Sequence, residues 1–304
     1  MKKVFLVKNE YINSRLDRWF RRNICEVPQS LIEKNIRKGK IKVNNIKQKS
    51  SYKLKENDQI SLFNINHLEN KHKIKTNKYI ASKKDLSESS RLIIEDNENF
   101  VVINKPSGVA VQSGTKSRRN ILDILKHTEE FYGSKPYAVH RIDKETTGIL
   151  IVAKNRKYAQ LFTSLFRIRK IHKIYIGLVL GEMKNKSGTL KDELTYYDSN
   201  KMYKSIAITD YVVLDSNNNY SLVELHPKTG RKHQLRKQLL IHGNPILGDS
   251  KYRFSQSKIG KKSTLMLHAY KIYFSISEKK YNFTAELPSN FNQTIKEKYL
   301  KISE

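Results

Sequence analysis

Cysteine is almost absent from this sequence: Cys25 is the one cysteine among 304 residues. A single cysteine excludes an internal disulfide, an iron–sulfur cluster and any zinc site built from paired cysteines. Disulfides are rare in the reducing cytoplasm, where thiols stay free. The cysteine count therefore favours a cytoplasmic protein without a cysteine-held metal.

Long apolar runs are lacking as well. No stretch approaches the roughly 18 consecutive apolar residues that a membrane-spanning helix needs. Near the N-terminus the apolar run covers only residues 4–7, whereas the apolar core of a secretory signal takes roughly 7–15 residues. We therefore expect neither a signal peptide nor a membrane anchor.

Acidic residues are scarce relative to basic ones, with 59 Lys+Arg, 29 Asp+Glu and a formal net charge of +30. A general compositional bias could produce this excess without any function, but the charge is unevenly distributed. Residues 1–63 hold 16 basic and 6 acidic residues and residues 92–304 hold 36 and 20, so the N-terminal segment has about twice the net charge per residue. The favoured partner is a polyanion, nucleic acid above all.

Residues 1–63 are predicted to form a small unit of two helices and a short strand. Apolar residues at helical spacing begin at Leu16. A second helix is expected over residues 28–37 and ends at Gly39, the residue type that most often terminates a helix. Residues 40–43 then alternate basic and apolar side chains, which is typical of a strand.

Four basic residues surround the junction of this helix and strand: Arg37, Lys38, Lys40 and Lys42. A solvated basic face would explain them without any ligand. Four positive charges this close repel one another, however, unless a polyanion lies nearby. We therefore interpret the cluster as a nucleic-acid contact.

The remaining chain divides into a linker and a larger domain. Residues 64–91 are rich in Lys, Asn and Ser without clear periodicity, and they are predicted to form a linker. From residue 92 to residue 304 strand patterns outnumber helical ones and do not alternate regularly with them. This predicts a mixed α+β domain on a large, mostly antiparallel sheet, in which the apolar run 149–153 is a strand buried on both faces.

A first candidate for chemistry is Asp143, which lies just before this buried strand. Arg141 and Lys144 flank it, and nearby cations keep a carboxylate ionised. An ionised Asp suits a nucleophile or base, although a turn carboxylate bonded to local backbone explains the pattern equally well. Asp143 and Glu145 could also form a glycosidase-like acid/base pair, for which two residues of separation are weak support.

A second candidate is the segment 225–236, where Gly230 leads into a predicted helix with several donors. Such a helix start can bind an anion, or it can simply be solvated. His233 has no second ligand at metal-binding spacing on that helix. The loop 104–108 lacks the Walker pattern, which disfavours ATP binding, and Tyr175 lies on an alternating strand, where most tyrosines are packing residues.

Together these segments resemble the RluA family of pseudouridine synthases, nearest its RluC branch, which acts on large-subunit ribosomal RNA. Ordered motifs carry the resemblance: NKPxG at 104–108, HR-[LI]-D-x-x-[ST]-[ST]-G at 140–148, KxY at 173–175, TGRxHQ[IL]R at 229–236, GxPIxGDxxY at 243–252 and LHA at 267–269. Residues 13–63 are similar to the small alpha-L (S-four-like) RNA-binding module that precedes this catalytic domain. The resemblance thus implies domains at 1–63 and 92–304, joined by the linker 64–91.

The resemblance also implies roles for individual residues in converting uridine to pseudouridine, a reaction that needs no cofactor. Asp143 is the essential carboxylate, which attacks the sugar, attacks the ring or removes the ribose 2′ proton; the sequence does not choose between these roles. Arg236 pairs with Asp143, Tyr175 stacks on the target base and is a candidate base for the carbon 5 proton, and Leu235 packs against the uracil. Arg141 fills the space that the extruded nucleotide leaves.

The expected partner is RNA, specifically large-subunit ribosomal RNA, and the expected state is a cytoplasmic monomer without metal or membrane contact. The N-terminal module would hold the RNA backbone and add affinity rather than base selection. Two alternatives remain open. An RNA-binding protein without catalysis could keep the scaffold, and a base-excising glycosylase would release free uracil.

Overall fold

The computed structural model describes residues 2–25, 27–64, 79, 81–113, 119–198, 201–254 and 264–302. The chain forms two compact units, residues 1–77 and residues 78–304, and each is described by itself. Within the described ranges, every helix is too short or too polar to cross a membrane.

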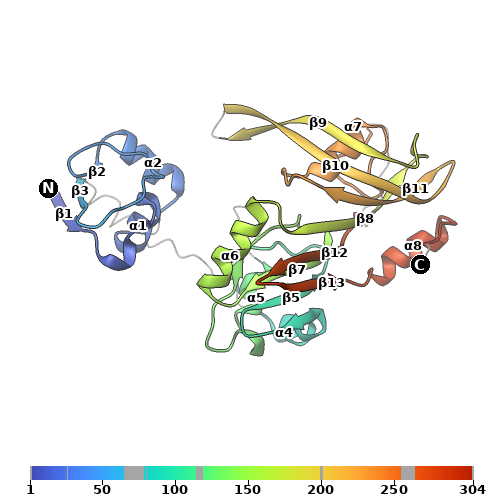
Figure 1. The fold of residues 1–304 in the computed structure, drawn as a ribbon, viewed down its shortest axis with the longest axis horizontal. Coiled ribbons are helices and arrows are strands. Elements are labelled where there is room, and N and C mark those ends of the chain that lie inside the picture. Colours follow the sequence, from blue (N-terminus) through green and yellow to red (C-terminus); the bar gives the residue numbers. More distant parts are fainter. Residues whose placement is uncertain are drawn as a thin grey trace. The chain divides into compact units, whose positions relative to one another are not determined.

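The N-terminal unit contains a three-stranded antiparallel sheet and two helices (Figure 1). The sheet has the order β1-β3-β2, from β1 (Lys2–Leu6), β3 (Gln59–Phe63) and β2 (Ile41–Val43), and the helices are α1 (Leu16–Asn23) and α2 (Gln29–Arg37), after a 3-10 turn η1 (Asn9–Tyr11). Leu16, Trp19 and Phe20 of α1 are buried in its core. Gly39 ends α2 with a φ of 70°, so both predicted helices and the short strand are confirmed.

The C-terminal unit is built on one ten-stranded sheet with the order β4-β5-β7-β12-β8-β11-β10-β9, while β6 pairs with β7 and β13 with β12. β7 and β12 pair in parallel, and every other pairing in this sheet is antiparallel. The strands are β4 (Ile93–Asp96), β5 (Phe100–Lys105), β6 (Tyr137–Ala138), β7 (Thr147–Ala153), β8 (His172–Leu180), β9 (Ser187–Asp198), β10 (Lys201–Asn217), β11 (Tyr220–Pro227), β12 (Leu267–Ile276) and β13 (Lys279–Thr284). The predicted mixed α+β fold with a mostly antiparallel sheet is confirmed.

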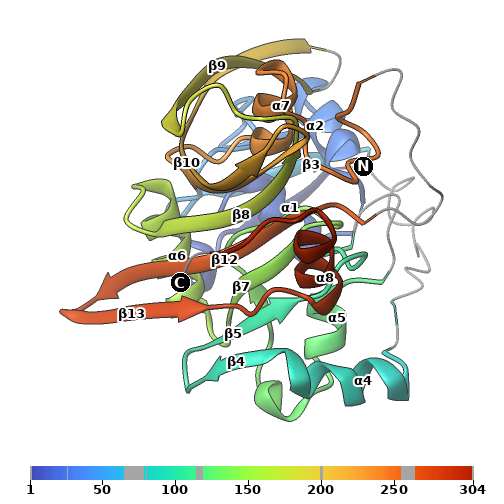
Figure 2. The same cartoon turned by 90° about the vertical axis from the view of Figure 1, so that its right-hand side faces the viewer.

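Helices cover this sheet on both faces around β5 and β7 (Figure 2). The helices and 3-10 turns of the unit are α4 (Lys83–Ser89), η2 (Ser90–Leu92), α5 (Ile121–Leu125), η3 (Glu129–Phe131), α6 (Arg156–Arg167), α7 (Gln234–Ile241) and α8 (Ser289–Glu297). Side chains alternate along a strand, so Leu150 and Val152 pack with α5, while Ile149 and Ile151 pack with Phe162 of α6. Every residue of β7 is buried, which confirms the prediction for residues 149–153.

Helix α7 packs on the other half of the sheet, where β8 and β11 lie. Its Leu235 and Leu239 belong to the same buried cluster as Leu178 of β8 and Val223 of β11. This packing matters for function because α7 also carries Arg236. A side chain on a helix that is anchored by its apolar face has a well-defined position.

The stretch 64–91, expected to be a linker, contains helix α4. Ser82 and Asp85 form a reciprocal capping box at its start, with Asp85 N donating to Ser82 Oγ at 3.1 Å and Ser82 N donating to Asp85 Oδ2 at 3.0 Å. Arg119 donates to the same carboxylate, which ties α4 to the start of α5. The capping box could have been read from the sequence; residues 65–78 and 80 lie outside the described residues.

Candidate active site

Asp143 lies in the loop between β6 and β7, and buried polar contacts hold this loop in place. The ammonium of Lys105, which is fully buried, donates to the backbone oxygens of Pro106, Val109 and Lys144 at 2.8, 3.0 and 3.1 Å. Burial lowers the pKa of Lys105 to about 7. The backbone N–H of Ile151 donates to His140 Nε2 at 2.9 Å. The rigid strand β7 and these contacts therefore fix the backbone from which Asp143 extends.

Arg236 of α7 connects Asp143 to a second carboxylate. Its Nη1 donates to Asp143 Oδ2 at 3.0 Å, while Nε and Nη2 grip the two oxygens of Asp249 at 2.7 and 2.8 Å. Burial would lower the pKa of Arg236, but the hydrogen bonds and charges of Asp249 and Asp143 raise it. The guanidinium is therefore permanently charged, and one oxygen of Asp143 is held in a fixed direction.

Asp249 is itself fixed by backbone groups. Its Oδ1 accepts from the N–H groups of Lys251 and Tyr252 at 2.8 and 2.9 Å. Burial raises the pKa of Asp249, but the hydrogen bonds from Arg236 and from these backbone groups outweigh burial and lower it. The aspartate thus stays ionised although it is buried, and it anchors Arg236.

Tyr175 extends from β8 into the same region. Burial raises the pKa of its phenol, and the charge of Asp143 raises it further. The phenol is therefore neutral at pH 7 in the free protein, which suits a stacking surface. A role as base would need a substrate that first changes this environment.

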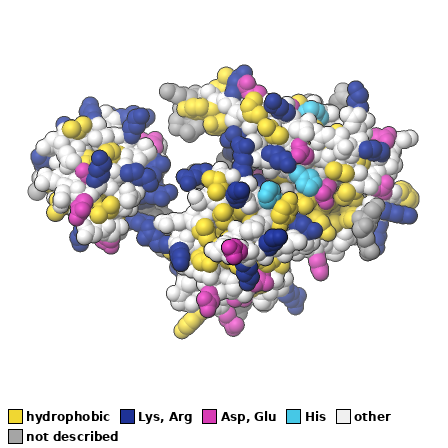
Figure 3. Space-filling view, in the orientation of Figure 1, with side chains coloured by type: hydrophobic (Ala, Val, Ile, Leu, Met, Phe, Trp, Pro, Cys, Tyr) yellow, Lys and Arg dark blue, Asp and Glu magenta, His cyan; other side chains and the backbone are white. Residues whose placement is uncertain are grey.

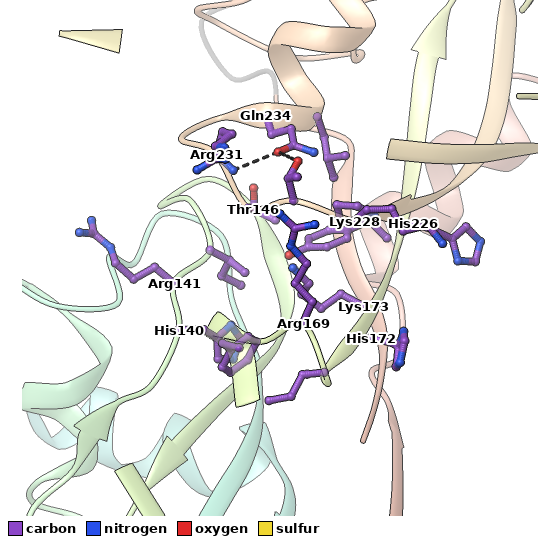
Figure 4. Close-up of a pocket in the computed structure, with 18 of the residues that line it drawn as sticks. His140, Arg141, Thr146, Arg169, His172, Lys173, His226, Lys228, Arg231 and Gln234 are labelled. Carbon is purple, nitrogen blue, oxygen red and sulfur yellow. Dashed lines mark hydrogen bonds between the residues drawn. The ribbon is translucent and has the colours of Figure 1, made fainter. Parts of the chain in front are cut away.

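Asp143, Tyr175 and Arg236 line an open cavity of about 800 Å³, part of whose lining is drawn in Figure 4. Among the described residues that line it, Asp143 is the sole acidic one, and seven are basic: Arg141, Arg167, Arg169, Lys173, Lys228, Arg231 and Arg236. Dark blue Lys and Arg side chains and cyan His side chains gather on the face of this unit that Figure 3 shows. A cavity of this size holds a nucleotide-sized ligand, and its charge favours an anionic one.

The structure brings together five residues singled out from the sequence: Asp143, Tyr175, Arg236, Leu235 and Arg141 all line this cavity. Arg141 extends away from the other labelled side chains in Figure 4. The remaining four, Arg37, Lys38, Lys40 and Lys42, lie in the N-terminal unit, at the junction of α2 and β2.

Sequence reasoning assigned no role to three residues of this site. Asp249 and Tyr252 belong to the GxPIxGDxxY motif, which carried the resemblance but no expected role. His233 is the N-cap of α7 with a φ of 54° and lies 3.7 Å from Asp143 through its Nε2 atom. Among the described residues, no group of three or more His, Cys, Asp and Glu side chains could hold a metal ion.

Comparisons with known proteins place the chain among enzymes of one kind. The family model described as RNA pseudouridylate synthase matches residues 99–240. The chain is 34% identical over 305 residues to "Ribosomal large subunit pseudouridine synthase C" of Rickettsia bellii, covering 95% of this chain and 100% of the relative. It is 30% identical to the protein of the same name from Vibrio vulnificus, covering 88% and 87%.

Solved structures agree with these matches. "Human RNA Pseudouridylate Synthase Domain Containing 4" superposes with a TM-score of 0.63 and 28% identity, covering 72% of this chain and 97% of that chain. "Human RNA Pseudouridylate Synthase Domain Containing 1" shares the fold, with a TM-score of 0.53 and 22% identity over 70% and 96% of the two chains.

Proposed function

The chain belongs to the RNA pseudouridylate synthase family, and on this premise we propose that it isomerises specific uridines of large-subunit ribosomal RNA, with Asp143 as the reacting carboxylate. The observation that carries the proposal is a cavity in which, among the described lining residues, Asp143 is the single carboxylate beside seven Lys and Arg residues. Such a cavity attracts the phosphates of RNA and offers one negatively charged group for chemistry. The names of the relatives reported above indicate ribosomal RNA as the substrate.

The reaction breaks the bond between uracil nitrogen 1 and ribose carbon 1′ and forms one between carbon 5 and carbon 1′. Atoms and oxidation state are conserved, so the reaction itself needs no cofactor. The grip of Arg236 on Asp143 Oδ2, at 3.0 Å, supports a pre-positioned carboxylate. The neutral ring of Tyr175 supports base stacking, and the position of Leu235 in the cavity lining supports its packing against the uracil.

Base extrusion is the role proposed for Arg141. A paired uridine must leave its helix before Asp143 can reach it, at a cost of roughly a few kcal/mol. Arg141 is exposed and extends away from the other labelled residues of the cavity. A long, charged side chain in this position can enter the space that the base vacates and contact the neighbouring bases or phosphates.

For the N-terminal unit we propose an alpha-L (S-four-like) RNA-binding domain over residues 1–63, joined by residues 64–91 to a catalytic domain over residues 92–304. Its support is the resemblance in sequence and the exposed positions of Arg37 and Lys38 at the end of α2. We further propose a monomer, because residues of one chain suffice to form the cavity. The single cysteine of the sequence supports a location in the reducing cytoplasm.

Release of tritium from ribosomal RNA labelled at uracil carbon 5 tests the proposed function, because carbon 5 loses its hydrogen when it bonds to the sugar. We expect release by the wild-type protein and none by Asp143→Asn, while the RNA affinity of the variant stays within about threefold. Glu182→Gln is the matched control, since Glu182 is 53% exposed and is not among the residues that line the cavity; it should keep its activity.

The same assay separates the alternatives. If the protein only binds RNA, the wild-type protein will bind the labelled RNA and release no tritium. A glycosylase would liberate free uracil, which chromatography of the supernatant detects, whereas a synthase leaves the base in the RNA. Wild-type activity in Asp143→Asn would remove Asp143 from the mechanism.

A further inference from the structure

His233 and Tyr252 form a pair beside Asp143. Tyr252 lies with its hydroxyl 2.9 Å from His233 Nδ1, and the two rings meet edge to face with centroids 5.4 Å apart. The other ring nitrogen of His233, Nε2, lies 3.7 Å from Asp143 Oδ1. This is the carboxylate oxygen that Arg236 does not hold.

The charge of Asp143 selects one tautomer of His233. Burial lowers the pKa of His233, and the cations Arg236, Lys251 and Lys232 add to this effect, while Asp143 opposes it. A neutral imidazole has one N–H. If Nδ1 carried it, the lone pair of Nε2 would face a carboxylate; if the hydroxyl of Tyr252 donates to Nδ1 instead, the N–H lies on Nε2 and faces Asp143 favourably.

This Nε2–H is a donor that lacks an acceptor within the described part of the chain. Its distance of 3.7 Å from Asp143 Oδ1 is too long for a hydrogen bond. His233 nevertheless lines the cavity, with its side chain 18% exposed. An oxygen of a bound ligand next to Asp143 would complete the hydrogen bond.

Resting on the proposed function, we propose that His233 is a further catalytic residue, which donates a hydrogen bond from Nε2 to a carbonyl oxygen of the target uracil. All three roles considered for Asp143 leave negative charge on this ring. When the bond to carbon 1′ breaks, the ring keeps the electron pair, and attack on the ring itself also moves charge to its oxygens. A fixed donor at such an oxygen binds the transition state more tightly than the substrate.

Tyr252 acts in this scheme as a positioning residue. Its hydroxyl sets the tautomer of His233, and Arg236 lies over its ring at 5.2 Å. The backbone N–H of Tyr252 donates to Asp249. His233 itself has a left-handed backbone with a φ of 54°, which histidine adopts more often than most residues other than glycine.

The test compares two amides that place their nitrogen differently. Gln ends about where imidazole Nε2 lies, whereas Asn ends near Nδ1, tolerates a left-handed backbone and can still bond to Tyr252. With tritium-labelled RNA we expect His233→Ala and His233→Asn to lose about 100-fold in kcat with KM within threefold. His233→Gln should have a kcat at least tenfold above that of His233→Asn. Tyr252→Phe should lose about tenfold in kcat, because it removes the hydroxyl that sets the tautomer but keeps the ring that packs against His233.

His242→Ala is the matched control, since His242 lies at the far end of the same helix and contacts Asp192 at 3.1 Å. Thermal midpoints of all variants separate lost activity from lost folding, and the comparison of Asn with Gln decides the matter even if the Ala variant unfolds. Equal activity of the Asn and Gln variants, or a His233→Ala variant within threefold of wild type, would overturn the inference. An inactive wild-type protein would instead remove the proposed function.

Discussion

At the scale of single residues, the position of Asp143 depends on a carboxylate far along the chain. Arg236 uses Nε and Nη2 for Asp249 and Nη1 for Asp143. A planar guanidinium can satisfy both partners at once, whereas the ammonium of a lysine has no such fork. The site therefore needs arginine here, and Asp249 acts on the chemistry by orienting Arg236.

His268 shows how burial of one residue makes stability depend on pH. Its side chain is fully buried, with Nδ1 2.8 Å from Thr147 Oγ1 and Nε2 3.2 Å from the backbone oxygen of Ala285. Burial lowers its pKa to about 4 from the ordinary 6.5. Between these values the unfolded chain binds a proton that the native protein does not, so the free energy of unfolding falls as pH drops, by about 3 kcal/mol for this group.

Urea unfolding of wild type and His268→Gln between pH 7.5 and 4 measures this contribution. Gln keeps a donor and an acceptor but does not titrate, so we expect a lower stability at pH 7 and a shallower decline below about pH 6.5. The difference between the two curves cancels the other titrating groups. Parallel curves would show that His268 is not held neutral in the native protein.

The site was readable from the sequence only where motifs resemble a known family. Asp143, Tyr175 and Arg236 came from three such motifs, and the structure brings them to one cavity. The pairing of His233 with Tyr252 was not readable, because it depends on how the chain returns from α7 to residue 252. The spacing within a motif indicates that a residue is needed, but it does not say which atom it faces.

At the scale of elements, the junction of β7 and β12 supports the loop of Asp143. The two strands pair in parallel through His268 with Thr147 and Ala269 with Gly148. Gly148 has a φ of 103°, and a Cβ there would lie 2.2 Å from the backbone oxygen of Ala269. Only glycine allows this close approach, five residues after Asp143.

Gly148→Ala should therefore destabilise the protein by about 2–5 kcal/mol, from backbone strain together with the clash. Gly133→Ala is the control, since Gly133 has a φ of 70° but no atom within 4 Å of the added Cβ; it should show the backbone cost of about 1–2 kcal/mol alone. Urea unfolding measures both. Equal losses in the two variants would mean that β7 and β12 can separate without cost.

The sequence predicted elements better than their arrangement. The helical spacing of Leu16, Trp19 and Phe20 and the apolar run 149–153 each report local burial, and both predictions are confirmed. The parallel pairing of β7 with β12 joins residues about 120 positions apart, so no local pattern reports it. Helix α4 was missed because its polar residues show no apolar helical pattern, although the Ser82–Asp85 capping box at its start is a local signal.

At the scale of the whole molecule, positive charge is present in both units. The C-terminal unit concentrates seven basic residues around one cavity. The N-terminal unit has a hollow of about 520 Å³ lined by Arg15, Arg18, Arg21 and Arg22 with two acids, besides the basic junction of α2 and β2. Under the proposed function, the charges of the cavity act on the target nucleotide, whereas those of the N-terminal unit add affinity for the rest of the RNA.

The salt dependence of RNA binding separates these two contributions. Each neutralised phosphate releases counterions, so the slope of log K against log salt becomes shallower by about 0.7–0.9 for each phosphate that the protein no longer neutralises. Replacing Arg37, Lys38, Lys40 and Lys42 by Ala should weaken binding and reduce the slope by up to about 3, while single-turnover release of tritium at saturating protein stays near the wild-type rate.

The matched control replaces four exposed lysines of the other unit, Lys184, Lys279, Lys280 and Lys296, which changes the net charge equally. If both sets of substitutions reduce the slope of log K against log salt equally, net charge rather than the α2–β2 junction governs RNA affinity. The N-terminal unit is then not a dedicated RNA-binding domain.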